Sequence, residues 1–302
     1  MQFQHAWILC HVVEFERVFN SIESAASFAA QRTALAILIP LNHRYGSNVL
    51  VAFVSDQGDR RANQDNAIVD IRQGLYAVLD GVGGGDSGEL ASALAAVTFR
   101  DEVCGSGAGL EPAVQAAHEA LVDFAAQSGI ETYCATTIAA VQETSHGMLA
   151  VWAGDSRIYR LTQDRLEQVS TDHADAEGAL TQALGHPSLA YIASGSSCYA
   201  AEPGARWLIC SDGLFRGLES EDIARLLGAP LDVGQITESL LRAALDADPG
   251  DNITLIVLEE EAGPSKSGGD DEEPLRAHRE IEQKRPKSPL DWLRTLGMGR
   301  DG

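Results

Sequence analysis

The stretch from Leu75 to Ser92 constrains the fold more than any other part of the sequence. It begins with an apolar run, Leu75 to Leu79, that is typical of a buried strand. The run ends on Asp80, a glycine-rich turn from Gly81 to Gly85 follows, and an amphipathic helix is predicted over residues 86–103. A carboxylate at the mouth of a buried strand is poorly solvated unless a positive group compensates it. We therefore expect a positive group beside Asp80.

The same arrangement of an acid at the end of an apolar run recurs elsewhere in the chain. A single Asp-Gly pair is more often a turn than a metal site. Here, however, Asp155 follows L-A-V-W-A-G, Asp212 follows W-L-I-C-S, and Asp251 precedes N-I-T-L-I-V-L. Each of these aspartates, like Asp80, has a glycine beside it or one step away. Because Mg²⁺ and Mn²⁺ prefer oxygen ligands, the recurrence predicts a hard-cation site.

Negative charge is concentrated in the middle of the chain. The net charge is −22 over 302 residues, while residues 1–48 and 262–302 each contain equal numbers of acids and bases. We do not expect so acidic a region to bind nucleic acid or an anionic membrane. Most of its charge is expected on a solvated surface. The five cysteines form no C-x-x-C pair, which favours reduced thiols and a cytoplasmic location.

The sequence divides into three expected segments. Residues 1–48 hold two apolar runs of about eight residues, too short for a membrane span of about 20. This segment is either a helical extension or the upstream translation of a gene that starts near Val49. Residues 49–261 form the main domain. Residues 262–302 begin as a linker that is disordered by composition and end in a short amphipathic tip.

Strands and helices come in blocks along the main domain. Helices are predicted over 86–103, 111–128, 219–227 and 233–246, and most strands lie between the second and third of them. Blocks of this kind favour an α+β fold with packed antiparallel sheets over a parallel doubly wound sheet.

A series of motifs in this chain resembles those of the metal-dependent protein serine/threonine phosphatases of the 2C type, in their bacterial form. The matching pieces cover about residues 49–260, and their order and spacing make the resemblance specific. They are S-D-Q-G-D-R-R-A-N-Q-D-N (55–66), L-D-G-V-G-G-G-D-S-G-E-L-A-S (79–92), A-T-T (135–137), A-G-D-S-R-I-Y-R-L (153–161), L-T-Q-A-L-G (180–185), C-S-D-G-L (210–214) and G-D-N-I-T-L-I-V (250–257).

The resemblance implies an α-β-β-α four-layer sandwich, in which two antiparallel sheets are flanked by helices and the metal site lies at one edge. It implies two Mn²⁺ or Mg²⁺ ions and a bridging water that attacks phosphorus. By position, Asp80 corresponds to the bridging ligand and Gly81 to a ligand through its carbonyl oxygen. Asp212 and Asp251 correspond to ligands of the first metal. Asp155 corresponds to the ligand of a weaker third ion, shared with Asp212.

The resemblance also implies roles for residues around the metals. Asp65 would orient a water on the side of the second metal, and Asn252 would support the aspartate before it. The phosphate-binding arginine is Arg60 when counted back from Asp65, but Arg61 when counted forward from Gly58. Both arginines therefore remain candidates.

Several positions depart from the family pattern. Gln64 stands where many relatives have Glu, which affects the affinity for the second metal. Val82 stands where the animal enzymes have a histidine that protonates the leaving oxygen, so we expect water on the third metal, near Asp155, to do this. The link from Asp172 to Leu180 replaces a helical flap, which predicts a more open site and altered substrate choice.

The activity implied by the resemblance is hydrolysis of phosphoserine and phosphothreonine in proteins, antagonising a bacterial Ser/Thr kinase. Phosphorylated proteins, including such a kinase and its substrates, are the expected partners, and the chain is expected to be a monomer. Two alternatives stay open. The chain could bind phosphopeptides without turnover, as a pseudophosphatase, or it could hydrolyse small phosphate esters. Comparing a phosphothreonine peptide with a small aryl phosphate would separate the protein phosphatase from the small-ester enzyme.

Overall fold

The structure is a computed structural model that describes residues 35–39, 48–82, 87–128, 134–163, 165–248 and 250–262. The chain divides into two units, Met1–Ala262 and Gly263–Gly302. The predicted linker and amphipathic tip lie outside the described residues, and so does most of the segment 1–48.

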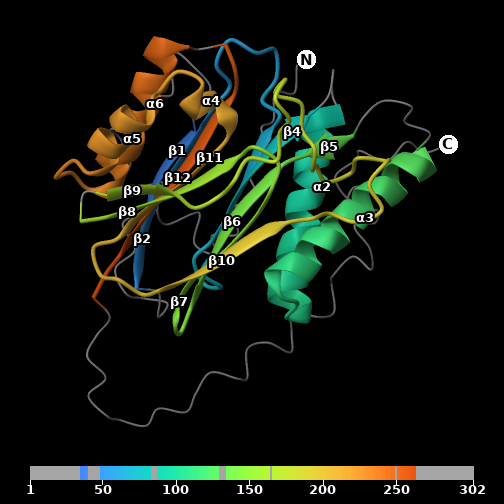
Figure 1. Ribbon diagram of the computed structural model, residues 1–302, viewed down its shortest axis with the longest axis horizontal. Coiled ribbons are helices and arrows are strands. Elements are labelled where there is room, and N and C mark those ends of the chain that lie inside the picture. The colour runs from blue at the N-terminus through green and yellow to red at the C-terminus, as the bar shows by residue number, and fades with distance from the viewer. Residues whose placement is uncertain are drawn as a thin grey trace, which may run out of the picture. The chain divides into compact units, whose positions relative to one another are not determined.

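Two antiparallel sheets form the centre of the first unit (Figure 1). The first sheet has the order β1 (Leu35–Ile39), β2 (Val49–Asp56), β12 (Ile253–Glu260), β11 (Arg206–Cys210), β8 (Arg157–Thr162) and β9 (Arg165–Gln168). The second has the order β10 (Gly195–Ala200), β7 (Gly147–Ala153), β6 (Ile138–Thr144), β4 (Leu75–Val82) and β3 (Asp65–Asp70). The short β5 (Ala135–Thr136) pairs with the end of β4.

The helices cover the outer faces of the two sheets. Figure 1 shows α5 (Ser220–Leu227) and α6 (Val233–Ala247) on one side, after the short α4 (Asp212–Phe215). On the other side lie α2 (Ser87–Asp101), which continues into a π-helical turn (Glu102–Ser106), and α3 (Leu110–Ser128). Because α6 packs on β2 and β12 while α2 packs on β3 and β4, the order of layers is helix, sheet, sheet, helix. The predicted four-layer sandwich is confirmed.

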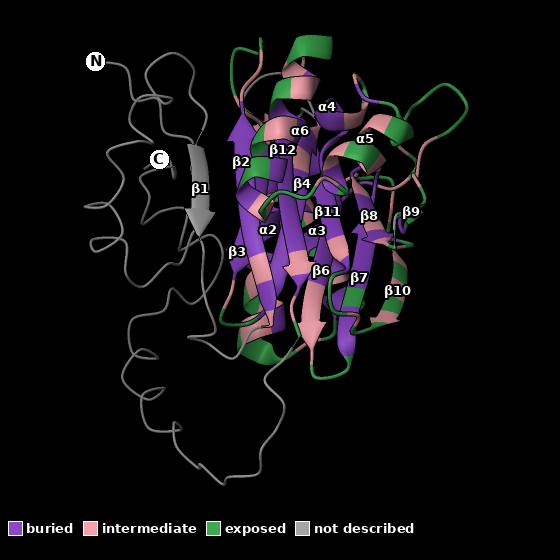
Figure 2. Cartoon of the chain, turned by 90° about the vertical axis from the view of Figure 1, so that its left-hand side faces the viewer, coloured by how far each residue is buried: buried purple, intermediate pink, exposed green. Residues whose placement is uncertain are grey.

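Burial on both faces explains the apolar character of β2, β11 and β12, the central strands of the first sheet (Figure 2). Phe53 of β2 and Ile256 of β12 point into the core between the sheets. Their neighbours Val54 and Leu255 point instead into the core beneath the helices. Successive side chains of a strand face opposite sides, so a strand with two covered faces must be apolar at every position.

The structure bears on two expectations about element boundaries. The two readings of residues 1–48, a helical extension or upstream translation, stay predictions. Within that segment, Leu35–Ile39 form the strand β1, which pairs antiparallel with β2. An apolar run of this length does not by itself distinguish a helix from a strand, and pairing with β2 decides it. Asp80 does not end its strand, because β4 continues through Gly81 and Val82 by pairing with β5.

The link from Asp172 to Leu180, which was predicted to replace a helical flap, contains no helix or strand. From Asp172 to Gly185, all of them described residues, the chain forms neither a helix nor a strand, and Ala174 and Leu180 form an isolated bridge. In the described part of the chain, no helix combines the length and apolar character needed to cross a membrane.

Candidate metal and phosphate site

The centre of the site is a pair of aspartates on neighbouring strands. Asp80 of β4 and Asp65 of β3 are direct antiparallel partners. The backbone N–H of Asp80 donates to Oγ1 of Thr137 at 3.0 Å, and the N–H of Thr137 donates to the Asp80 carbonyl oxygen at 2.9 Å. These bonds fix the backbone of Asp80, and with it the direction of its carboxyl group.

Hydroxyl groups next to the other aspartates connect them to this pair. Oγ of Ser156, which follows Asp155, lies 2.7 Å from Oγ1 of Thr137. Oγ of Ser211, which precedes Asp212, donates to Oδ2 of Asp65 at 2.7 Å. Sequence reasoning missed both serines, although each stands inside a motif, A-G-D-S or C-S-D-G. They hold the turn after β7 and the end of β11 against the Asp65–Asp80 pair.

The aspartates form one electrostatic cluster. The pKa of Asp80 is raised well above its usual value. The main cause is desolvation by the surrounding protein, although the residue is not fully buried, and nearby negative charges raise the pKa further. Those charges belong to Asp65, Asp155, Asp212 and Asp251. The structure therefore brings together carboxyl groups from β3, β4, the turn after β7, the start of α4 and the loop directly before β12.

Other members of the cluster titrate abnormally for the same reasons. Desolvation raises the pKa of Asp65 to about 7, with smaller contributions from the charges of Asp212 and Asp251. Desolvation and then the charge of Asp212 raise the pKa of Asp155 to about 6. Desolvation also raises the pKa of Asp212. Negative charge is thus unfavourable here without added cations.

A close backbone approach lies directly beside Asp80. A Cβ atom at Gly81 would lie 2.2 Å from the carbonyl oxygen of Gly88, and a Cβ atom at Gly88 would lie 2.8 Å from the carbonyl oxygen of Gly81. Only glycine fits at both positions. The Gly88 position also lies close to Nε2 of Gln64. The Gly81 carbonyl group is consequently held between β4, the start of α2 and the Gln64 side chain.

Asn252 holds the loop that carries the arginines. Its Nδ2 donates to the carbonyl oxygens of Gln57 at 2.8 Å and Ala62 at 3.1 Å, and its Oδ1 accepts from the N–H of Gln64 at 2.9 Å. Asn252 therefore fastens the 57–64 loop to the start of β12. The backbone N–H of Asn252 also donates to Oδ1 of Asp251 at 2.8 Å.

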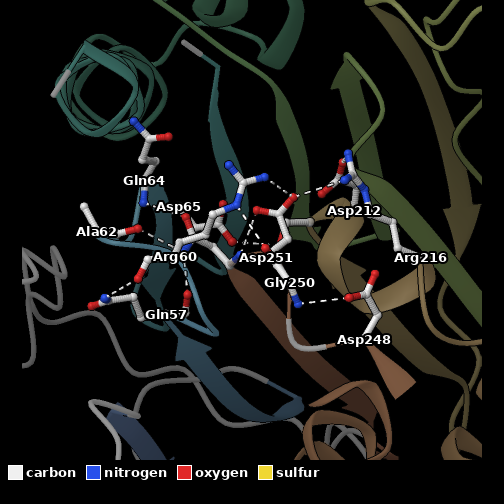
Figure 3. A network of polar contacts seen from close by, with 12 residues as sticks. Gln57, Arg60, Ala62, Gln64, Asp65, Asp212, Arg216, Asp248, Gly250 and Asp251 are labelled. Atoms are coloured by element: carbon white, nitrogen blue, oxygen red, sulfur yellow. Dashed lines mark hydrogen bonds and ion pairs between the residues drawn. The ribbon is translucent and has the colours of Figure 1, made fainter. Parts of the chain in front are cut away.

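The geometry distinguishes the two candidate arginines. Nη2 of Arg60 lies 2.8 Å from Oδ2 of Asp251, and its Nε donates to the Gly250 carbonyl oxygen at 3.1 Å (Figure 3). Arg61 is exposed and makes no hydrogen bond or ion pair to another residue that the structure describes. Arg60 is the arginine that lies beside the aspartate cluster.

Sequence reasoning missed a further cation in the site, Arg216. Its Nη2 lies 2.6 Å from Oδ2 of Asp212 and its Nη1 lies 3.3 Å from Oδ2 of Asp251 (Figure 3). The signal was present in the sequence, because residues four apart on a helix share a face and Arg216 follows Asp212 by four.

The donor set fits divalent cations with oxygen preference. It consists of carboxylate oxygens and the Gly81 carbonyl, without the thiolates and imidazoles typical of zinc. Among the residues that the structure describes, no three acidic, histidine or cysteine side chains are already arranged as a ligand group. In this structure the positive charge beside these carboxylates comes from arginines. Arg60 forms an ion pair with Asp251, and Arg216 forms ion pairs with both Asp212 and Asp251.

The raised pKa values predict that the metal-free protein loses stability as the pH rises. Between the usual value of 3.8 and about 7, the folded state binds more protons at Asp65 than the unfolded state does. Stability should therefore fall across this window, and Asp155 should add to the fall up to about pH 6. Thermal melting in chelator at a series of pH values measures it. A melting temperature that stays level or rises from about pH 5 to about pH 8 would contradict this prediction.

Comparisons with known proteins agree with this fold. No protein-family model matches the sequence. Over 229 residues, 68% of this chain, the sequence is 32% identical to the serine/threonine protein phosphatase PstP of Mycobacterium tuberculosis. The matched region covers 44% of PstP, so the chain spans less than half the length of this curated relative.

Solved structures match over nearly their whole length. MsPP of Mycobacterium smegmatis, a PPM Ser-Thr phosphatase in complex with cacodylate, is 30% identical with a TM-score of 0.62, covering 70% of this chain and 99% of MsPP. This chain belongs to the PPM family of serine/threonine phosphatases, as its motifs indicated. The catalytic domain of PstP in complex with two manganese ions is 27% identical, with a TM-score of 0.62 over 71% of this chain and 99% of that domain.

Proposed function

We propose that this chain is a metal-dependent phosphatase that hydrolyses phosphoserine and phosphothreonine in proteins. One observation carries the proposal, namely the gathering of aspartates from distant segments into one cluster with an arginine beside it. These residues are Asp65, Asp80, Asp155, Asp212, Asp251 and Arg60. A cluster with this much negative charge can hold divalent cations, and an adjacent guanidinium can hold a phosphate.

The proposed cofactors are two Mn²⁺ or Mg²⁺ ions. Asp80 would bridge them, the Gly81 carbonyl would be a further ligand, and Asp212 and Asp251 would hold the first ion. When bound, the ions supply the positive charge that a phosphate dianion needs and acidify a water that serves as nucleophile. The presence of two manganese ions in the PstP catalytic domain supports the number. A weaker third ion is assigned to Asp155, which titrates under the influence of Asp212.

The chain's own residues bind and orient the reactants. Arg60 would hold the phosphoryl oxygens, since its side chain is 49% exposed and its guanidinium already lies at Asp251, a proposed metal ligand. Asp65, fixed by Ser211, would orient a water for attack. Asn252 fastens the loop that carries Arg60 to the start of β12. We assign no phosphate contact to Arg61.

We also propose the substrates of the reaction and the compartment in which it takes place. Phosphorylated proteins would be the substrates, among them a bacterial Ser/Thr kinase that the phosphatase antagonises, together with that kinase's own substrates. The bacterial origin of the named relatives supports this choice. A cytoplasmic location is supported by the free thiols among the described cysteines, Cys104, Cys134, Cys198 and Cys210. We retain the expectation of a monomer that does not bind nucleic acid.

The test is hydrolysis of a phosphothreonine peptide by the full chain with Mn²⁺, with Mg²⁺ and with chelator. We expect turnover that requires metal and is lost in Asp212→Ala. A small aryl phosphate measured in parallel should be a poorer substrate by kcat/KM. Peptide binding without turnover under any metal would favour a binding module, and a preference for the aryl phosphate would favour a small-ester phosphatase.

Replacing Asp155 by Ala tests the third ion. We expect kcat to fall by about 10²-fold or more, because the leaving oxygen would lose its source of a proton, while binding of the first two ions is retained. Turnover of phosphothreonine peptide should be measured at saturating Mn²⁺, with Mn²⁺ stoichiometry from calorimetry. An Asp155→Ala protein with unchanged kcat would remove the proposed role.

A further inference from the structure

Two arginines that lie far apart in the sequence contact the same carboxylate oxygen. Arg60 lies in the loop after β2 and Arg216 directly after α4, and both contact Oδ2 of Asp251, at 2.8 Å and 3.3 Å (Figure 3). Arg216 also pairs with Asp212 at 2.6 Å. Asp212 and Asp251 are the residues to which the proposed function assigns the first metal. The described structure thus places a guanidinium where a divalent cation is expected.

The backbone beneath Arg216 is held rigidly, whereas its guanidinium is not enclosed. A Cβ atom at Gly213 would lie 2.0 Å from the carbonyl oxygen of Asn252, so α4 packs directly on the start of β12. The Phe215 ring lies 3.7 Å from the guanidinium carbon of Arg157, which is itself paired with Asp172. The Arg216 side chain is 53% exposed. Its guanidinium can therefore change partners without movement of the helix.

We propose that Arg216 has two successive binding partners. Without metal it is the counter-ion of Asp212 and Asp251, and when divalent cations take these carboxylates it becomes a second phosphate-binding residue beside Arg60. The inference rests on the proposed function, since it assumes that these carboxylates hold metal.

Competition for the same oxygens is the physical basis of the first partner. A guanidinium and a divalent cation both bind carboxylate lone pairs, and each repels the other at close range. Metal binding must therefore displace Arg216, and the free energy of the ion pairs opposes it. Removing the guanidinium should strengthen metal binding.

The common contact on Asp251 is the basis of the second partner. Because Arg60 and Arg216 reach the same oxygen, a phosphoryl group beside the cation that replaces them lies within reach of both. Guanidinium groups bind phosphate oxygens in bidentate fashion, which makes a displaced arginine an effective ligand for a dianion. Removing the guanidinium should weaken phosphate binding, which is the opposite sign to its effect on metal.

The first measurement is Mn²⁺ binding to the full chain by calorimetry, without substrate. Arg216→Gln should bind Mn²⁺ about three- to tenfold more tightly than wild type. The matched control is Arg225→Gln, which changes the net charge equally at an exposed arginine of α5 that pairs with Asp222. The control should leave Mn²⁺ affinity unchanged. Unchanged or weaker Mn²⁺ binding by Arg216→Gln, or equal tightening in the control, would overturn the proposal.

The second measurement is inorganic phosphate binding to the same proteins saturated with Mn²⁺. Arg216→Gln should bind phosphate about tenfold more weakly, and Arg216→Lys should recover part of the loss because it keeps the charge. Unchanged phosphate affinity in Arg216→Gln would overturn the second partner. A merely structural arginine would weaken metal and phosphate binding together, and thus contradict the proposal as well.

Both measurements are equilibrium binding constants, so they can be made on protein that does not turn over substrate. If wild type failed to hydrolyse any phosphopeptide but the two opposite shifts were found, the proposed function would fail and the assignment of Arg216 would hold. If turnover were metal-dependent but the shifts were absent, the proposed function would hold and the assignment of Arg216 would fail.

Discussion

Replacing Asp80 by Asn lowers metal-dependent turnover by about 10³-fold or more, which corresponds to ~4 kcal/mol of lost transition-state stabilisation. The carboxylate of Asp80 lies at the centre of the cluster, and the negative charge of every other aspartate in the cluster acts on it. An amide of the same shape carries no charge with which to bridge two cations. The measurement is kcat for a phosphothreonine peptide across a range of Mn²⁺ concentrations.

The same substitution should raise the stability of the metal-free protein. The Asp80 carboxyl group is desolvated and lies among like charges, so its ionised form opposes folding when no cation is bound. In chelator near pH 8, Asp80→Asn should melt above wild type, and added Mn²⁺ should reverse the order. Asp222→Asn, at an exposed aspartate of α5, is the control for net charge. A variant that keeps turnover within tenfold of wild type would rule out the bridging role.

Replacing Arg60 by Ala lowers kcat/KM for a phosphothreonine peptide by about 10²-fold, whereas Arg61→Ala changes it by less than about threefold. Arg60 points its guanidinium at the Asp251 carboxylate, and the loop that carries it is tied to β12 by Asn252. Arg61 is exposed and has no partner among the described residues.

The two arginines are neighbours, so each variant is a control for the other in net charge and in disturbance of the loop. Inorganic phosphate should inhibit Arg60→Ala more weakly than wild type, while its inhibition of Arg61→Ala should be unchanged. Equal losses in the two variants would show that the charge of the loop matters and that neither guanidinium holds the phosphoryl group.

The elements of the fold could be read from the sequence to the extent that their signals are local. The helices at 111–128 and 233–246 were predicted within a residue of α3 and α6, because helical periodicity involves only near neighbours. Leu35–Ile39 lies in an apolar run whose local sequence does not distinguish a helix from a strand. It is a strand because β2 has a free edge for it to pair with.

The site shows the same division between local and distant signals. Asp155, Asp212 and Asp251 stood out as acids at the ends of apolar runs, and the family resemblance assigned them to one metal site. Their own neighbouring residues, however, do not show that they face one another. Ser211 illustrates the difference, since its hydroxyl joins β11 to Asp65, which lies 146 residues earlier in the chain. The sequence left Arg60 and Arg61 as alternatives, and in the structure only Arg60 forms an ion pair with Asp251.

What the sequence determined by itself is the positions of the strands, the acids at their ends and the glycines beside them. Backbone preference and burial pattern over a few residues are sufficient for these features. What only the tertiary structure decided is which acids share one electrostatic environment and which arginines reach it. Desolvation and charge interactions depend on distances between residues far apart in the chain, and these distances exist only once the two sheets have packed together.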